Sequence, residues 1–123
     1  MSITCKMMNS GLSFKDAITL AESIITRFEK IEGKPWGAEG ALIELTKQVG
    51  ELSKLIMVHE NYYFSDRDKL DKQYEAAAQK IADELADIFY AVIRIAKHYN
   101  IDFEKAHLEA REKEDDFLKS KGV

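Results

Sequence analysis

The chain has 123 residues, of which 46% are hydrophobic and 33% charged, and its formal net charge at pH 7 is -4. This composition fits one domain, residues 1–123, with a core of its own and a loose N-terminal segment at 1–12. No basic stripe offsets the acidic balance, which argues against binding a nucleic acid polymer. No apolar run reaches the roughly 18 residues that would predict a membrane span.

Cysteine usage and the N-terminal sequence bear on the cellular compartment. The single cysteine, Cys5, excludes an internal disulfide framework and is compatible with a reducing compartment. The first residues lack the charged segment followed by a long apolar run that a secretory signal would show. We therefore expect a cytoplasmic protein that does not bind membranes.

Two amphipathic helices are predicted in the first half of the chain. Ser13 is a suitable N-cap for the first helix, which Gly33 and Pro35 would end. Its apolar positions recur at helical spacing: Ile18, Ala21, Ile25 and Phe28. A second helix would follow the turn-prone segment 33–40 and run to about Glu60. Its apolar positions are Leu42, Leu45, Val49, Leu52 and Ile56.

Two further helices are predicted in the second half. Ser65 or Asp66 can cap the third helix, and Asn100 is a suitable stop. The third helix has the longest apolar series: Leu70, Tyr74, Ala77, Ile81, Leu85, Ile88, Val92 and Ile95. Asp102 can cap a charged fourth helix over 103–122. Its thin apolar line consists of Phe103, Ala106, Ala110 and Phe117.

These patterns predict an all-α fold, a bundle of about four helices. No alternating strand pattern of useful length occurs, and helices of this kind pack in bundles. The apolar faces of the second and third helices are too broad for one layer of four helices. We therefore expect a homo-dimer or homo-tetramer.

Acidic side chains line both of the broadest helices beside their apolar faces. Glu44, Gln48 and Glu51 are four and three residues apart, so they lie on one stripe of the second helix. Glu84 and Asp87 are three apart on the third helix. If these helices pack antiparallel, the two stripes converge. Such convergence is costly unless pKa values rise or a cation binds.

Oxygen ligands of this kind favour magnesium, whereas zinc usually takes histidine or cysteine. His59, His98 and His107 lack the paired spacing of metal ligands. The alternative interpretation is that these carboxylates are ordinary solvated flanks of amphipathic helices. Gly50 favours a site, because a glycine inside a helix costs about 1 kcal/mol relative to alanine and usually has a packing or functional reason.

The tracts LIELTKQVGELSKLI and KIADELADIFYAVIRIAKHYNID resemble the MazG-like, all-α nucleoside triphosphate pyrophosphohydrolases, over about residues 36–113. In that family an E-x-x-E pair and an E-x-x-D pair on successive helices bind magnesium, which holds the triphosphate. The resemblance implies that Glu51, Glu84 and Asp87 are catalytic ligands of Mg²⁺. It implies a neutral fourth ligand at Gln48, where the family has glutamate.

The resemblance also implies a substrate and supporting residues. A nucleoside triphosphate would be hydrolysed to the monophosphate and pyrophosphate, which cleans the nucleotide pool. Trp36 lies where the family's base or sugar pocket is expected, and Asp83 or Glu44 would support the ligands. Glu44 in particular would compensate for the charge that Gln48 lacks.

Two departures keep a second function open. The first is Gln48, where the family has glutamate. The second is in the fourth helix, where Ala110 and Glu114 align with a lysine and an asparagine of the family. The nearby basic residues Arg111 and Lys113 fall on other faces of that helix. The alternative is a catalytically degenerate relative that binds nucleotide or metal, or that acts as a helical interaction module.

Overall fold

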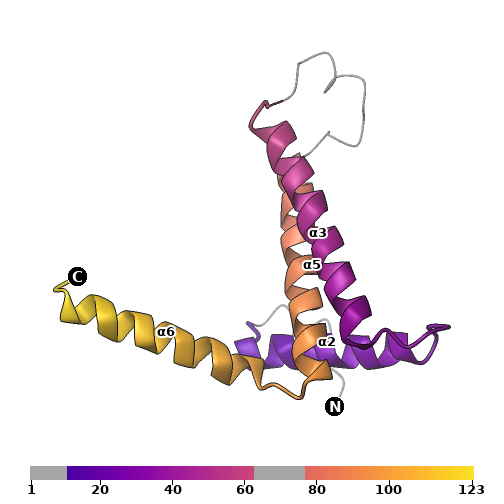
Figure 1. Cartoon of the computed structure of the whole chain (residues 1–123), viewed down its shortest axis with the longest axis horizontal. Helices are drawn as coiled ribbons and strands as arrows, with labels where there is room; N and C mark the ends of the chain where they lie inside the picture. The colour runs from indigo at the N-terminus through magenta and orange to yellow at the C-terminus, as the bar shows by residue number, and fades with distance from the viewer. Residues whose placement is uncertain (1–10, 63–76) are drawn as a thin grey trace. The chain divides into compact units, whose positions relative to one another are not determined.

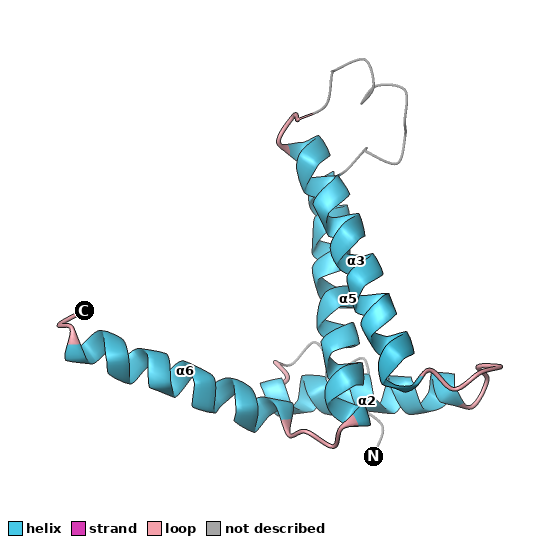
Figure 2. Ribbon diagram, viewed as in Figure 1, coloured by secondary structure: helices cyan, strands magenta, loops and turns pink. Residues whose placement is uncertain are grey.

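Four α-helices make up the regular structure of the described residues, 11–62 and 77–123, in this computed structural model (Figure 1). They are α2 (Phe14–Glu29), α3 (Gly37–His59), α5 (Ala77–His98) and α6 (Phe103–Ser120). These two stretches contain no strand (Figure 2), so the predicted all-α fold is confirmed for them. None of their helices is long and apolar enough to cross a membrane.

Some sequence predictions concern residues outside the described ranges. These are Cys5, most of the segment 1–12, the caps at Ser65 or Asp66, and the helical positions Leu70 and Tyr74.

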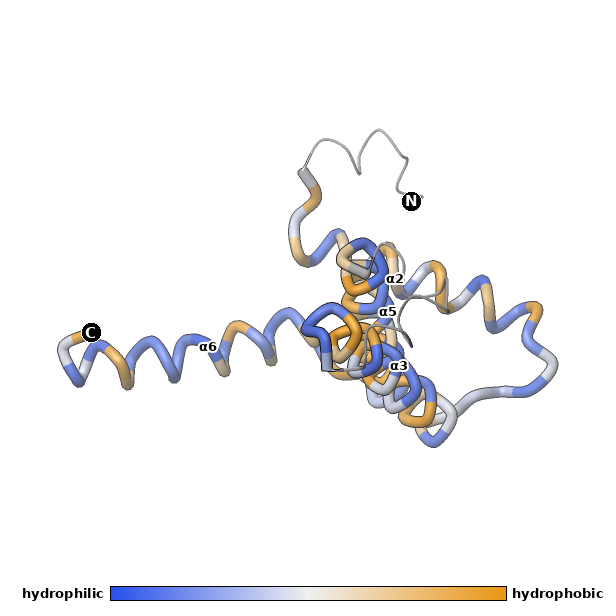
Figure 3. The backbone as a smooth tube through the Cα atoms, turned by 90° about the horizontal axis from the view of Figure 1, so that it is seen from above, coloured by the Kyte–Doolittle hydropathy of each residue, from blue (hydrophilic) through white to orange (hydrophobic). Residues whose placement is uncertain are grey.

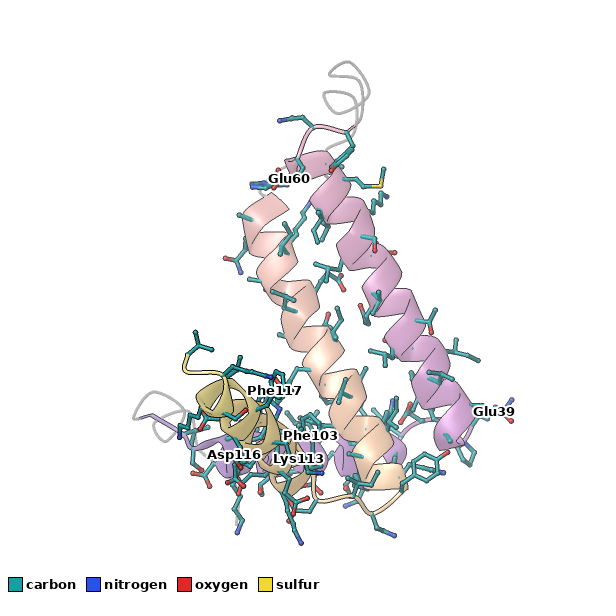
Figure 4. The ribbon with its side chains drawn as sticks, turned by 60° about the vertical axis from the view of Figure 1, so that its left-hand side comes forward. Glu39, Glu60, Phe103, Lys113, Asp116 and Phe117 are labelled. Carbon is teal, nitrogen blue, oxygen red and sulfur yellow. The ribbon has the colours of Figure 1, made fainter. Side chains whose placement is uncertain are left out.

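The chain divides into two units, which we describe separately. The hairpin unit, Trp36–Val92, contains α3 and most of α5. Within it the two helices run antiparallel and side by side (Figures 1 and 3). Figure 4 shows their side chains occupying the space between them, with Glu39 and Glu60 near opposite ends of α3. The buried apolar residues of this unit are Ala41, Leu55, Val58 and Ala91.

The terminal unit, Met1–Pro35 and Ile93–Val123, contains α2, the end of α5, and α6. Its α2 starts at the predicted residue. Ser13 Oγ accepts a hydrogen bond from Asp16 N at 3.1 Å, and Ser13 N donates to Asp16 Oδ2 at 3.4 Å. This capping box satisfies amides that a helix start leaves without intrahelical partners. The buried apolar residues of the unit are Ala21, Ile25, Ile93 and Ala96.

The α5–α6 junction also follows the sequence prediction. Asn100 adopts a left-handed conformation with φ 55° just after α5 ends, a conformation that asparagine tolerates better than most residues. Asp102 Oδ1 then accepts a hydrogen bond from Lys105 N at 3.0 Å and caps α6. The Phe103 ring lies 6.0 Å from that of Phe14, centroid to centroid, which brings the start of α6 against α2.

Several residues predicted to be core are not covered. Leu42 is 57% exposed, Val49 44% and Leu85 54%. No residue of α6 is buried, and the tube of Figure 3 is mostly hydrophilic along it. The physical reason is that an amphipathic face wider than the contact with one neighbouring helix stays partly in water. The periodicity therefore located the apolar faces but overstated how much of them the single chain buries.

The most buried charged side chain belongs to the terminal unit. Arg94 Nη2 lies 2.7 Å from Glu32 Oε1, and the two side chains are 9% and 18% exposed. This contact ties the segment after α2 to the end of α5. Charge-assisted hydrogen bonds of this kind contribute more in a shielded setting than at the surface.

We predict that Glu32→Gln lowers the free energy of unfolding by about 1–3 kcal/mol, because it removes the negative charge that faces a largely buried guanidinium. Urea denaturation followed by circular dichroism measures the change. The matched control is Glu109→Gln, which removes an exposed contact with Lys105 at 3.9 Å and should change stability by less than about 0.5 kcal/mol. Equal effects of the two variants would contradict the prediction.

Candidate functional site

The candidate site begins with three polar residues on one stripe of α3. Glu44, Gln48 and Glu51 follow each other at four and three residues within this regular helix, so their side chains project from the same side. Gln48 Nε2 donates a hydrogen bond to Glu44 Oε1 at 2.8 Å, and this contact is partly buried. Glu51 is exposed. The stripe therefore offers one carboxylate to solvent and one amide that is held by a neighbouring carboxylate.

The facing helix, α5, contributes three more carboxylates. Asp83 and Asp87 are four residues apart on this helix, just over one turn, and Glu84 lies between them in the sequence. Asp83 and Asp87 are exposed, and Glu84 is half-buried. Gln79 Nε2 donates to Asp83 Oδ1 at 3.1 Å. Asp83 thus has a polar partner on its own helix.

The Glu84 carboxylate is the unusual group of the site. Its Oε2 atom is shielded from water and has no hydrogen-bond partner among the described residues. Burial raises the pKa of Glu84 above its ordinary value of 4.5, and the charges of Asp87, Glu51 and Asp83 raise it further, while Lys47 opposes them. Glu51 is on α3 and Glu84 is on α5, so the two acidic stripes come within electrostatic reach of each other.

These carboxylates are of the chemical type that a hard divalent cation prefers as ligands. An unsatisfied, shielded carboxylate oxygen beside further carboxylates is relieved by proton uptake or by a cation, and oxygen donors of this kind suit Mg²⁺. Within the described residues, no three His, Cys, Asp or Glu side chains converge closely enough to form a complete metal-binding group. Carboxylates repel one another, so a tighter arrangement of Glu51, Glu84 and Asp87 is expected only around a cation.

Trp36 stands at the start of α3 within the hairpin unit. It precedes Gly37 as the N-cap residue, without a side-chain capping bond, and is 37% exposed. A Cβ built at Gly40 would lie 3.1 Å from Trp36 Cβ and 3.5 Å from its Cγ. The indole is therefore packed along the first turn of α3 and leaves part of its surface accessible to a ligand.

At Gly50, unlike at Gly40, no described neighbouring side chain explains why the residue is glycine. A Cβ built at this position meets no described atom within 4 Å. Helix packing within the described chain therefore does not require glycine between Val49 and Glu51, and a functional reason for Gly50 stays a prediction.

The residues of α6 belong to the terminal unit. Ala110, Arg111, Lys113 and Glu114 are all exposed. The Arg111 guanidinium pairs with the Glu114 carboxylate one turn along the helix. Arg111, one of the two basic residues next to the expected phosphate-binding positions, is thus paired on its own helix.

The three histidines do not join the carboxylates in a metal-binding group within the described part of the chain. The His107 ring lies 5.6 Å from that of Phe14, and the His98 ring lies 4.9 Å from that of Tyr99 in an edge-on arrangement. His59 is exposed at the end of α3.

Sequence reasoning missed two features. Lys47 is the cation that acts on Glu84, and only its place one turn before Glu51 on α3 could have suggested this role. A cavity of about 250 Å³ in the terminal unit also had no sequence signal, because it forms where three helical segments meet. Its lining residues include Ile18, Glu22, Ile93, Lys97, Ile101 and Phe103.

Comparison with known proteins adds no assignment. No family model matches the chain, and no match was found among curated proteins or solved structures.

The raised pKa of Glu84 predicts how stability depends on pH in the absence of metal. The folded chain holds this proton more tightly than the unfolded chain, so the contribution of Glu84 to stability falls as pH rises from 4.5 through the raised pKa. Glu84→Gln removes the titration and should gain stability relative to the original chain across that window.

Thermal melts of both proteins at a series of pH values measure this difference. Glu112→Gln, an exposed change on α6, is the control and should show a flat difference. If the difference in melting temperature between Glu84→Gln and the original chain does not change with pH, the Glu84 carboxyl is solvated as usual.

Proposed function

We propose that this chain is a magnesium-dependent nucleoside triphosphate pyrophosphohydrolase of the MazG-like type. The observation that carries the proposal is the shielded Glu84 carboxylate, without a hydrogen-bond partner for its Oε2 among the described residues and within reach of the charges of Asp87 and Glu51. A protein retains an unfavourable group of this kind more readily when a ligand relieves it. The motif order on two antiparallel helices, QVGE and then ELAD, supports the same chemistry.

In this proposal, Glu51, Glu84 and Asp87 hold the cation, with Gln48 as a neutral fourth oxygen ligand. Bound magnesium supplies charge neutralisation of the triphosphate and polarisation of the α-phosphoryl group. A carboxylate of the set orients a water molecule and accepts its proton as the water oxygen attacks the α-phosphorus. The bond between the α-phosphorus and the bridging oxygen breaks, which releases nucleoside monophosphate and pyrophosphate.

Trp36 is the proposed contact for the base or sugar. Its indole lies against Gly40 in the first turn of α3, and 37% of the residue's surface stays accessible. Aromatic rings bind nucleobases through stacking that tolerates different bases.

We predict that incubation with a panel of nucleoside triphosphates and Mg²⁺ yields monophosphate and pyrophosphate. Glu84→Gln and Asp87→Asn should each reduce the rate by at least about a hundredfold, because removing a ligand or its charge loses stabilisation that the transition state requires. Anion-exchange chromatography of the products measures this. Glu112→Gln is the matched control and should retain the original rate. Release of inorganic phosphate alone would contradict the reaction proposed.

A second function has specific support. Gln48 lowers the negative charge of the ligand set, and Arg111 is paired with Glu114 on α6. Both features favour a degenerate relative that binds nucleotide or metal without turnover, or a helical interaction module. Thermal shift separates these, because a ligand that binds the native state stabilises it by RT ln(1 + [L]/Kd). Stabilisation without turnover supports a binding protein, and no response to nucleotide or Mg²⁺ supports an interaction module.

We further propose that the chain acts as a homo-dimer or homo-tetramer. Exposed apolar residues occur on both helices of the hairpin unit: Leu42, Ile43, Val49, Ile56, Leu85 and Phe89. Exposed apolar side chains on neighbouring helices favour an interaction site, and a closed symmetric assembly would cover them.

Sedimentation equilibrium at micromolar concentration should therefore give a multiple of the 14.1 kDa chain mass. Leu42→Lys should shift the population toward the monomer, because a charge would have to be buried in the interface. The control is Leu118→Lys, an exposed apolar position on α6, which should leave the mass unchanged. A monomer for the original chain would contradict this proposal.

A further inference from the structure

The cavity of the terminal unit lies where α2, the end of α5 and the start of α6 meet (Figure 1). All of its lining residues belong to this unit, and its volume is about 250 Å³. An engineered protein cavity of about 150 Å³ is large enough to bind benzene. The cavity of this chain can therefore hold a molecule with one ring and a short side chain.

The most buried residues that line the cavity are apolar. Ile93 is 1% exposed and Ala96 is 7% exposed, and both contribute from the end of α5. Ile18 on α2 and Phe103 at the start of α6 also line it, and both are half-buried. Displacing water from apolar side chains is favourable, so these residues form a floor suited to the apolar part of a ligand.

Charged residues also line the cavity, and carboxylates outnumber ammonium groups among them. They are Glu22, Asp102, Glu104, Lys15 and Lys97. Asp102 is engaged as the cap of α6, where its Oδ1 accepts a hydrogen bond from Lys105 N. Lys97 Nζ lies 3.8 Å from Glu29 Oε1. The charges left to act on a ligand are therefore mainly those of Glu22, Glu104 and Lys15.

Two of these carboxylates reach the cavity from different helices. Glu22 belongs to α2 and Glu104 to the first turn of α6, and both residues are half-buried. Within the described ranges, neither carboxylate forms an ion pair. Water screens a half-buried charge less than an exposed one. A cationic group beside the apolar floor is therefore favoured over an anionic one.

We propose that this cavity binds a small primary monoamine with an apolar body, such as a single aromatic ring. The ammonium group lies near Glu22 and Glu104, and the ring lies against the apolar floor. Phe103 adds an aromatic ring to the lining, and the face of such a ring attracts an ammonium group. Lys15 repels a second positive charge, which favours a monoamine over a diamine. The site belongs to the terminal unit and does not depend on the function proposed for the hairpin unit.

The test is a titration of the full chain with phenethylamine, followed by heteronuclear NMR, which reports both affinity and place. Two further probes separate the contributions: hydrocinnamate carries the ring with a carboxylate, and methylammonium carries the charge without the ring. Phenethylamine should shift the amide signals of α2, the end of α5 and the start of α6, with a Kd of about 1 mM or tighter. Each of the other two probes should bind at least about tenfold more weakly.

Substitutions locate the site. Glu22→Gln should weaken phenethylamine binding about tenfold, because it removes a charge beside the ammonium group. Glu112→Gln, the same change at an exposed position of α6 outside the cavity, is the matched control and should leave the Kd unchanged. Ala96→Leu should abolish binding by filling the floor. Because Ala96 is buried, Thr19→Trp at an exposed lining position provides a second obstruction.

Thermal melts check that each variant is folded, and affinities are compared only between folded samples. Hydrocinnamate binding as tight as that of phenethylamine, or an undiminished affinity in Glu22→Gln, would overturn the assignment of an amine. Phenethylamine binding that persists in both obstructed variants would overturn its location in the cavity, and absence of binding by the original chain would overturn the site itself. A selective loss in Glu22→Gln supports the proposal whether or not the chain hydrolyses a triphosphate.

Discussion

Electrostatic repulsion between the two helices of the hairpin unit is the constraint around which the candidate site is organised. The antiparallel pairing of α3 and α5 brings the Glu51 charge within reach of a shielded carboxylate at Glu84, where Asp83 and Asp87 already add negative charge. Lys47 offsets only part of it. Such an arrangement lowers the stability of the isolated chain, because like charges and desolvation both disfavour ionisation. A bound cation would convert the same arrangement from a cost into a binding site.

The helices α3 and α5 form the apolar contact of the hairpin unit and also carry the polar residues of the candidate site. Their apolar residues hold the pair together through small and branched side chains such as Ala41, Leu55 and Val58, and the polar stripes lie directly beside this seam. Ligands placed on regular helices keep their mutual spacing, since the backbone geometry leaves little freedom. The remaining apolar residues of the two helices stay exposed. The helices that carry the candidate site therefore also carry the surface that an oligomer would cover.

The polar contacts on each helix give the carboxylates different surroundings. Asp83 is held by Gln79 and Glu44 is held by Gln48, whereas Glu84 Oε2 has no such partner among the described residues. Glutamine therefore appears twice as a donor to an acidic residue one turn away. In both cases the amide nitrogen is the donor and a carboxylate oxygen is the acceptor.

The terminal unit is stabilised by helix caps, a shielded ion pair and aromatic contacts. Its order comes from helix caps at Ser13 and Asp102, from the Arg94–Glu32 contact and from aromatic rings at the start of α6. Beyond that start, α6 is exposed along its length. A helix with so little buried surface depends on its own capping and its intrahelical ion pairs.

The sequence by itself determined the helical periods, the caps at Ser13 and Asp102 and the stop at Asn100, because these depend on local backbone chemistry. It also determined which acidic residues share a helical face, since that follows from spacing alone. It could not determine burial: the predicted apolar series included Leu42, Ile56 and Leu85, which are exposed. It left out Leu55, which is buried. Only the tertiary structure decided that Glu84, rather than Glu51 or Asp87, is the shielded carboxylate and that Gln48 donates to Glu44, because burial and side-chain partners depend on which surfaces meet in space.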